Sequence, residues 1–157
     1  MTSEHPSVTS FRAALARLGG RGHVRTLPDS VHTAALAAEA LGCEVGAIAN
    51  SLVFDADGSP VLILTSGSHR VDTAKVAADL GLGRLRRASP EFVRTHTGQA
   101  IGGVSPIDHP APVQTYIDRE LRGYAVVWAA AGHAAAVFDT TYDELVQLTG
   151  AQELDVA

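Results

Sequence analysis

Residues 48–65, IANSLVF-DADGSP-VLILT, carry the clearest structural signal in the chain. The two outer segments, 48–54 and 61–65, are apolar and rich in β-branched residues, which is typical of strands. The linker between them combines Asp, Gly, Ser and Pro, the residue types of a hairpin turn. The stretch therefore predicts two antiparallel strands. Asp55 and Asp57 are therefore better interpreted as turn residues than as a pair of catalytic carboxylates.

Outward from this hairpin, helical and strand patterns interleave along the chain. Ser89-Pro90 predicts a helix start, and Thr141 with Glu144 forms a capping box that opens another. Because short strand pairs recur, we expect an α/β (α+β-like) fold: a single domain over 1–157 with one mixed, largely antiparallel sheet and helices around it. The remaining expected helices are 7–18, 31–41 and one through Leu80 that Asp72 or Thr73 can cap. The remaining expected strands are 23–27, 82–88, 113–117, 124–128 and 134–138.

Composition limits the class of protein. Of 157 residues, 46% are hydrophobic and 18% charged, and no apolar stretch reaches the length of a membrane span. We expect a soluble globular protein without a membrane partner. The net charge of −5 excludes a molecule that binds nucleic acid through its overall charge, so such a contact would be local. One cysteine, Cys43, and an N-terminus without a signal pattern favour the cytoplasm. The oligomeric state is left open.

Common catalytic and cofactor motifs are missing from the sequence. Seven histidines are scattered without ligand spacing, and no nucleophile elbow, Walker loop or dinucleotide fingerprint occurs. We therefore expect no metal and no cofactor.

Residues 97–109, TGQAIGGVSPIDH, form the most distinctive loop. Gly102 and Gly103 remove side chains where the backbone bends or approaches another group closely. Pro106 fixes one φ angle and stiffens the turn. Such a frame presents backbone N–H groups that can hold a carbonyl or phosphate oxygen. A tight surface turn is the alternative.

Two further stretches also leave alternatives open. The arginine run at 84–94 fits either a solvated strand edge or a phosphate-contacting patch. Residues 66–72, SGSHRVD, follow a strand and precede a helix. They either line a pocket or form an ordinary connection with a helix cap.

Taken in series, these segments resemble the YbaK family of aminoacyl-tRNA deacylases, which is similar to the editing domain inserted in bacterial prolyl-tRNA synthetases. The resemblance runs from about Thr26 to the C-terminus, and its most specific part is GGVSP after Thr97-Gly98. The other matching segments, in the family's order, are IANSLV at 48–53, RVDTAKVA at 70–77, YID at 116–118 and Ala131-Gly132.

The resemblance implies a curved sheet that holds a small aminoacyl pocket and a metal-free hydrolase that removes mischarged amino acids from tRNA. A prolyl tRNA is the favoured substrate, and the partners are tRNA and a synthetase served in trans. The loop Gly102–Pro106 would contact the 3′-terminal aminoacyl-adenosine. The implied catalytic positions are Asn50, Gly102 and Gly103, and the implied substrate-binding positions are Val104, Ser105, Pro106, His69, His133, Gly132 and Lys75.

Asn50 departs from the family, which commonly has a lysine at this position. An asparagine supplies a neutral amide in place of a positive charge. Three interpretations follow. Asn50 does a retuned version of the same task, or another cation such as Lys75, Arg70 or His133 replaces the lysine. In the third, the protein binds aminoacyl-tRNA or a related ligand without hydrolysing it.

Overall fold

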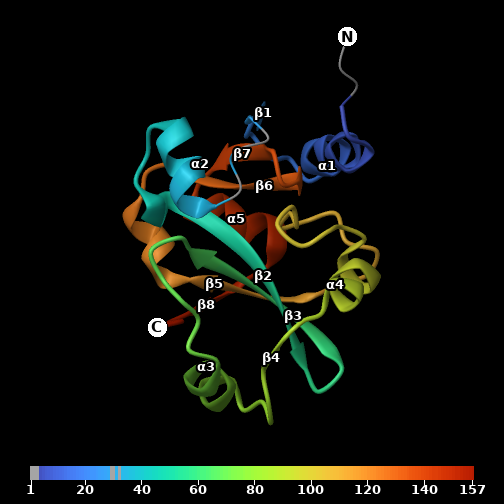
Figure 1. Ribbon diagram of the computed structural model, residues 1–157, viewed down its shortest axis with the longest axis vertical. Coiled ribbons are helices and arrows are strands. Elements are labelled where there is room, and N and C mark those ends of the chain that lie inside the picture. The colour runs from blue at the N-terminus through green and yellow to red at the C-terminus, as the bar shows by residue number, and fades with distance from the viewer. Residues whose placement is uncertain (1–3, 29–30, 32) are drawn as a thin grey trace.

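The structure is a computed structural model that describes residues 4–28, 31 and 33–157. Its strands form one eight-stranded sheet in the order β1-β7-β6-β2-β3-β5-β8, with β4 paired to β2 (Figure 1). The strands are β1 (Val24–Thr26), β2 (Ile48–Ala56), β3 (Ser59–Ser66), β4 (Arg86–Arg87), β5 (Gln114–Asp118), β6 (Val127–His133), β7 (Ala136–Thr140) and β8 (Gln152–Leu154).

The sheet is mixed, as predicted. β2 pairs with β3 and β4 antiparallel, and β7 pairs with β1 and β6 antiparallel. The pairings β2–β6, β3–β5 and β5–β8 are parallel. The central hairpin β2–β3 closes on Asp57 and Gly58, both at positive φ, and the Asp55 carboxylate accepts the Gly58 N–H at 2.6 Å. Asp55 therefore serves the turn, as its surroundings in the sequence indicated.

Five α-helices surround the sheet, and short polar side chains begin four of them. The helices are α1 (Pro6–Arg17), α2 (Ala34–Leu41), α3 (Thr73–Leu80), α4 (Pro90–Thr97) and α5 (Tyr142–Thr149), with 3₁₀ turns η1 (Val45–Ala47) and η2 (Arg119–Gly123). The side chains of Thr33, Asp72, Ser89 and Thr141 each accept a backbone N–H in the first turn. The caps at Asp72, Ser89 and Thr141 were predicted. No described helix has the length and apolar character needed to cross a bilayer.

The two faces of the β2–β3 hairpin bury different cores, because side chains alternate along a strand. On one face, Ala49, Val53 and Leu64 join the cluster that includes Phe11 of α1 and Leu145 of α5. On the other face, Phe54 and Ile63 pack with Val76 of α3, and Ile48 packs with Ala37 of α2.

The structure corrects several predicted boundaries. The strand expected over 82–88 is reduced to Arg86–Arg87, and the strand expected from residue 124 begins at Val127 because η2 occupies the segment before it. The strand expected over 134–138 is β7, shifted by two residues after an irregularity between 130 and 133. The last strand, β8, was not predicted, since three residues after a helix are too short for a pattern. Residues 29, 30 and 32, which fall in the predicted turn and helix start, lie outside the described residues.

Candidate functional site

A gap in the central sheet defines the main cleft. Along one edge, β6 pairs only with Ile48 and Ala49, and β4 pairs only with Phe54 and Asp55. Within the described chain, residues 50–53 therefore have a strand neighbour on the β3 side alone. A cleft of about 1290 Å³ opens at this gap. The loop that follows α4, yellow to orange in Figure 1, lies in the angle between β6 and β2.

Residues 50–53 offer polar groups to the cleft. Gly67 N–H donates to the Ile48 carbonyl at 2.7 Å, so the backbone groups of Ile48 point toward β3. Alternation along the strand then turns the N–H and C=O of Ser51 away from β3 and into the gap. The Ser51 hydroxyl is also buried without a partner among the described residues. By the same alternation, Asn50 shares a face with Phe54, and Ser51 shares the opposite face with Val53.

The loop after α4 is held by its own polar side chains. The Gln99 side-chain carbonyl accepts the Ser105 N–H at 2.7 Å, and the Ser105 hydroxyl donates to the Ile107 carbonyl. The ring of His109 contacts the Ser105 carbonyl through Nε2 at 2.8 Å. Burial lowers the pKa of His109 below its ordinary value, so the neutral ring is the favoured form. Gln99 and Ser105 are buried, which makes this frame an internal brace.

The N–H groups of the loop alternate between bonded and free. Gly103 N–H donates to the Ala100 carbonyl at 3.0 Å, and Ser105 N–H is used by Gln99. The N–H groups of Gly102 and Val104 have no acceptor within the described part of the chain, and both residues line the cleft. The sequence predicted spare donors in this loop. The two residues that carry them alternate with those that hold the loop in place.

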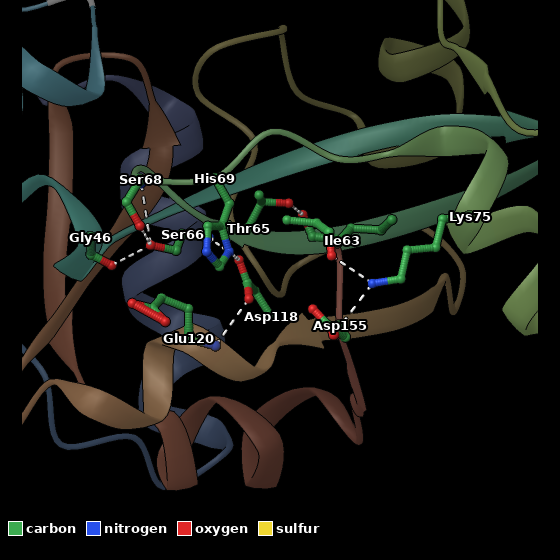
Figure 2. A network of polar contacts seen from close by, with 11 residues as sticks. Gly46, Ile63, Thr65, Ser66, Ser68, His69, Lys75, Asp118, Glu120 and Asp155 are labelled. Atoms are coloured by element: carbon green, nitrogen blue, oxygen red, sulfur yellow. Dashed lines mark hydrogen bonds and ion pairs between the residues drawn. The ribbon is translucent and has the colours of Figure 1, made fainter.

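His69 lines the same cleft from the turn after β3. Its Nδ1 lies 2.9 Å from Oδ2 of Asp118, a carboxylate whose side chain is only 1% exposed. Figure 2 shows the ring pointing toward this carboxylate, with Ser66 and Glu120 beside it. Sequence reasoning named Asp118 only as part of a matching segment. Its place directly after the strand residues 115–117 was the available signal. That signal could not reveal its partner His69, which lies 49 residues away in the sequence.

Other predicted site residues lie outside the cleft lining. Lys75 forms an ion pair with Asp155 at 3.3 Å and donates to the C-terminal Ala157 (Figure 2). His133 accepts the Ala135 N–H through Nδ1. Gly132 allows a close approach of α1, because a Cβ there would stand 2.7 Å from the Ser7 carbonyl oxygen.

The predicted residues therefore separate into three groups, of which Lys75, His133 and Gly132 form the one away from the cleft. Asn50, His69, Gly102 and Val104 are brought together around the cleft. The buried residues Gly103, Ser105 and Pro106 form the layer of the loop behind Gly102 and Val104.

Two arginines supply positive charge at the cleft. Arg70 and Arg87 are exposed, line the cleft and form no ion pair with any described residue. By contrast, Arg12, Arg119 and Arg122 are paired with glutamates elsewhere. Among residues 4–28, 31 and 33–157, no three His, Cys, Asp or Glu side chains lie together as a metal site would require.

Comparison with known proteins decides the family. Residues 28–148 match the aminoacyl-tRNA editing domain. The chain belongs to this family. The editing domain described here is similar to a crystal structure provisionally identified as a trans-editing enzyme for prolyl-tRNA synthetase, with 46% identity, a TM-score of 0.91 and 98% of each chain covered.

Two sequence relatives extend this result. The editing domain is 30% identical to the uncharacterized protein YwhH of Bacillus subtilis (strain 168), over 91% of each chain. It is also 32% identical over 94 residues to a proline–tRNA ligase of Nitratidesulfovibrio vulgaris. That match covers 60% of the editing domain but only 16% of the ligase.

Proposed function

We propose that this editing domain is an aminoacyl-tRNA deacylase that hydrolyses the ester between a mischarged amino acid and the 3′-terminal ribose of tRNA. The observation that carries the proposal is the pair of spare N–H groups on Gly102 and Val104, on a braced loop that lines the cleft. Ester hydrolysis develops negative charge on the carbonyl oxygen. Preorganised backbone donors stabilise that charge without moving during the reaction.

The open edge of β2 supplies the opposite wall of the proposed site. The backbone groups and hydroxyl of Ser51 can hydrogen-bond polar parts of the aminoacyl-adenosine, and Asn50 offers an amide with both donors and an acceptor. Apolar residues complete this wall, among them Ile48, Leu52 and Trp128. A mostly apolar cleft with a few placed polar groups is typical of a small-molecule site, and here the small molecule is the end of a nucleic acid.

Arg70 and Arg87 favour a nucleic-acid substrate over a free amino-acid ester. Each guanidinium can contact a phosphate in a planar, bidentate manner. Since the whole chain carries a net charge of −5, such local cations are needed to hold RNA. Arg87 belongs to the arginine run whose phosphate-contacting interpretation the sequence left open.

For the substrate we propose tRNA specific for proline, charged with a small or medium amino acid by a separate synthetase. This rests on similarity to a proline–tRNA ligase and to the structure provisionally identified as its trans-editing enzyme. The test is incubation of the purified protein with tRNA charged with a panel of small and medium amino acids. Release of one of them well above the uncatalysed rate supports the proposal. Background rates for the whole panel would refute it.

The neutral side chain of Asn50 favours a second candidate: a domain that binds aminoacyl-tRNA without turnover. In that case a non-hydrolysable aminoacyl-adenosine analogue binds saturably, whereas no charged tRNA loses its amino acid. The two functions give opposite results in the same panel.

A further inference from the structure

Asp118 is a buried carboxylate whose orientation is fixed by the backbone. Its Oδ2 accepts the Ser66 N–H at 3.0 Å, and its Oδ1 accepts the Glu120 N–H at 3.0 Å. Both donors belong to the main chain, Ser66 at the end of β3 and Glu120 in η2, so the carboxylate cannot turn freely. The third contact, from His69 Nδ1 to Oδ2 at 2.9 Å, therefore fixes the imidazole in turn (Figure 2).

This arrangement leaves the other ring nitrogen of His69 available. A carboxylate only accepts hydrogen bonds, so Nδ1 carries the proton and Nε2 carries the lone pair. Nε2 has no hydrogen-bond partner in the described chain, the side chain is 27% exposed, and the residue lines the cleft. A histidine that is oriented by a buried carboxylate, keeps its other ring nitrogen free and lines a cleft has the arrangement of a general base.

The turn that carries His69 is itself anchored next to Asn50. His69 N–H donates to the Ser66 carbonyl at 3.0 Å, and the Ser66 hydroxyl donates to the Gly46 carbonyl at 2.7 Å. Thr65, immediately before this turn, is the cross-strand partner of Asn50. His69 follows Thr65 by four residues and lines the same cleft as Asn50, the position where the editing-domain family commonly has a lysine.

We propose that His69 is the general base of the proposed hydrolysis and that Asp118 is its positioning residue. This inference rests on the proposed function. His69 Nε2 removes a proton from a water molecule, whose oxygen attacks the ester carbonyl carbon. The resulting oxyanion is held by the N–H groups of Gly102 and Val104. The bond from the carbonyl carbon to the ribose oxygen then breaks, and the proton on Nε2 passes to that oxygen.

The charges around the pair support this cycle. During the reaction the imidazole becomes an imidazolium, which the buried Asp118 carboxylate stabilises. Arg70 follows His69 in the chain, and its positive charge favours transfer of the proton from Nε2 of His69 to the ribose oxygen. The other titratable groups on the elements that pack on this turn are Glu44 beside η1, Glu120 of η2 and Tyr124 after it.

Chemical rescue tests the proposal directly. We expect His69→Ala to lower kcat about 100-fold or more on the tRNA that the wild-type protein hydrolyses best. Added imidazole should restore part of that rate, because the open cleft admits it. His23→Ala is the matched control, since the His23 side chain, directly before β1, is 90% exposed and lies outside the cleft lining. It should keep the wild-type rate and show no response to imidazole.

The pH profile of kcat separates a base from a structural residue. Wild type should lose rate at acid pH along a single-proton limb, which His69→Ala should lack. Asp118→Asn should lower the plateau, because the ring loses the carboxylate that orients it. The proposal would be overturned if His69→Ala kept the wild-type kcat or the acid limb of its pH profile, or if added imidazole did not restore the lost rate. In each of these cases hydrolysis by the wild-type protein would still support the proposed function. Inactive wild-type protein would overturn both.

Discussion

Gly103 lies so close to His133 that a Cβ atom at residue 103 would stand 2.8 Å from the Cα and carbonyl carbon of His133. The loop with the spare N–H groups is therefore seated backbone to backbone on the turn between β6 and β7. This contact fixes the position of Gly102 and Val104 relative to the β2 gap. It also explains why residue 103 has no side chain, although Gly103 donates its own N–H inside the loop.

Gly103→Ala should displace the loop and lower the deacylation rate by about 100-fold, the usual cost of losing an oxyanion donor. Gly123→Ala is the matched control, because a Cβ there meets nothing within 4 Å. Release of amino acid from charged tRNA measures both variants. Equal activity of Gly103→Ala and Gly123→Ala would show that the loop position does not matter for the reaction.

Ser105→Ala should destabilise the fold by about 1–3 kcal/mol, because it leaves buried partners of the hydroxyl unsatisfied. Ser105 is fully buried, and its hydroxyl donates to the Ile107 carbonyl. Urea unfolding followed by circular dichroism gives the free energy of unfolding. The control is Ser59→Ala, at an exposed position at the start of β3, which should stay within about 0.5 kcal/mol of wild type. Equal free energies for the two variants would refute the bracing role of Ser105.

Local signals made most of the fold predictable. The hairpin of residues 48–65 and the caps at Asp72, Ser89 and Thr141 depend on neighbours a few residues away, and the structure confirms them. The boundaries that were wrong depend on distant contacts. The short β4 exists only through its pairing with β2, and β8 only through its pairing with β5.

In the candidate site, too, local sequence signals were predictive and contacts between distant residues were not. The glycines and Pro106 of GGVSP predicted a stiff turn with free N–H groups, whereas the brace that Gln99 and His109 supply was not predicted. By contrast, the gap along residues 50–53 arises where β6 and β4 stop pairing, and no local pattern reports that. The His69–Asp118 contact joins residues 49 positions apart. Lys75, chosen by resemblance, faces Asp155 instead of the cleft, since β8 brings the C-terminal segment beside α3.

Asn50→Lys tests whether Asn50 is adapted to the substrate of this protein or reflects the loss of a catalytic lysine. If His69 supplies the base, a lysine at residue 50 adds a charge beside Arg70 and His69 that the site does not need. We expect kcat/KM to fall about tenfold, on the order of the cost of one misplaced charge. Asn50→Gln, which keeps the amide, should fall less. A gain of hydrolysis in Asn50→Lys would instead indicate an enzyme that lost activity with its lysine.

His109→Gln should reduce the acid sensitivity of the fold. The pKa of folded His109 lies below its ordinary value of 6.5, chiefly because burial disfavours the charged ring. The unfolded chain then binds the proton more readily, so this contribution to stability is complete above about pH 6.5 and is lost as the pH falls toward the folded pKa. Urea unfolding at pH 7.5 and 5.5 should show a smaller loss in the variant. Equal losses in variant and wild type would contradict the assignment.

The central claim is hydrolysis of mischarged tRNA. Its most direct measurement compares, under single-turnover conditions, the release of proline and of each member of a panel of small and medium amino acids from the same proline-specific tRNA. The account predicts rapid release of at least one panel member by wild-type protein, a rate near background for proline, and loss of that release in Gly103→Ala. Background rates for the whole panel in the wild-type protein would contradict it.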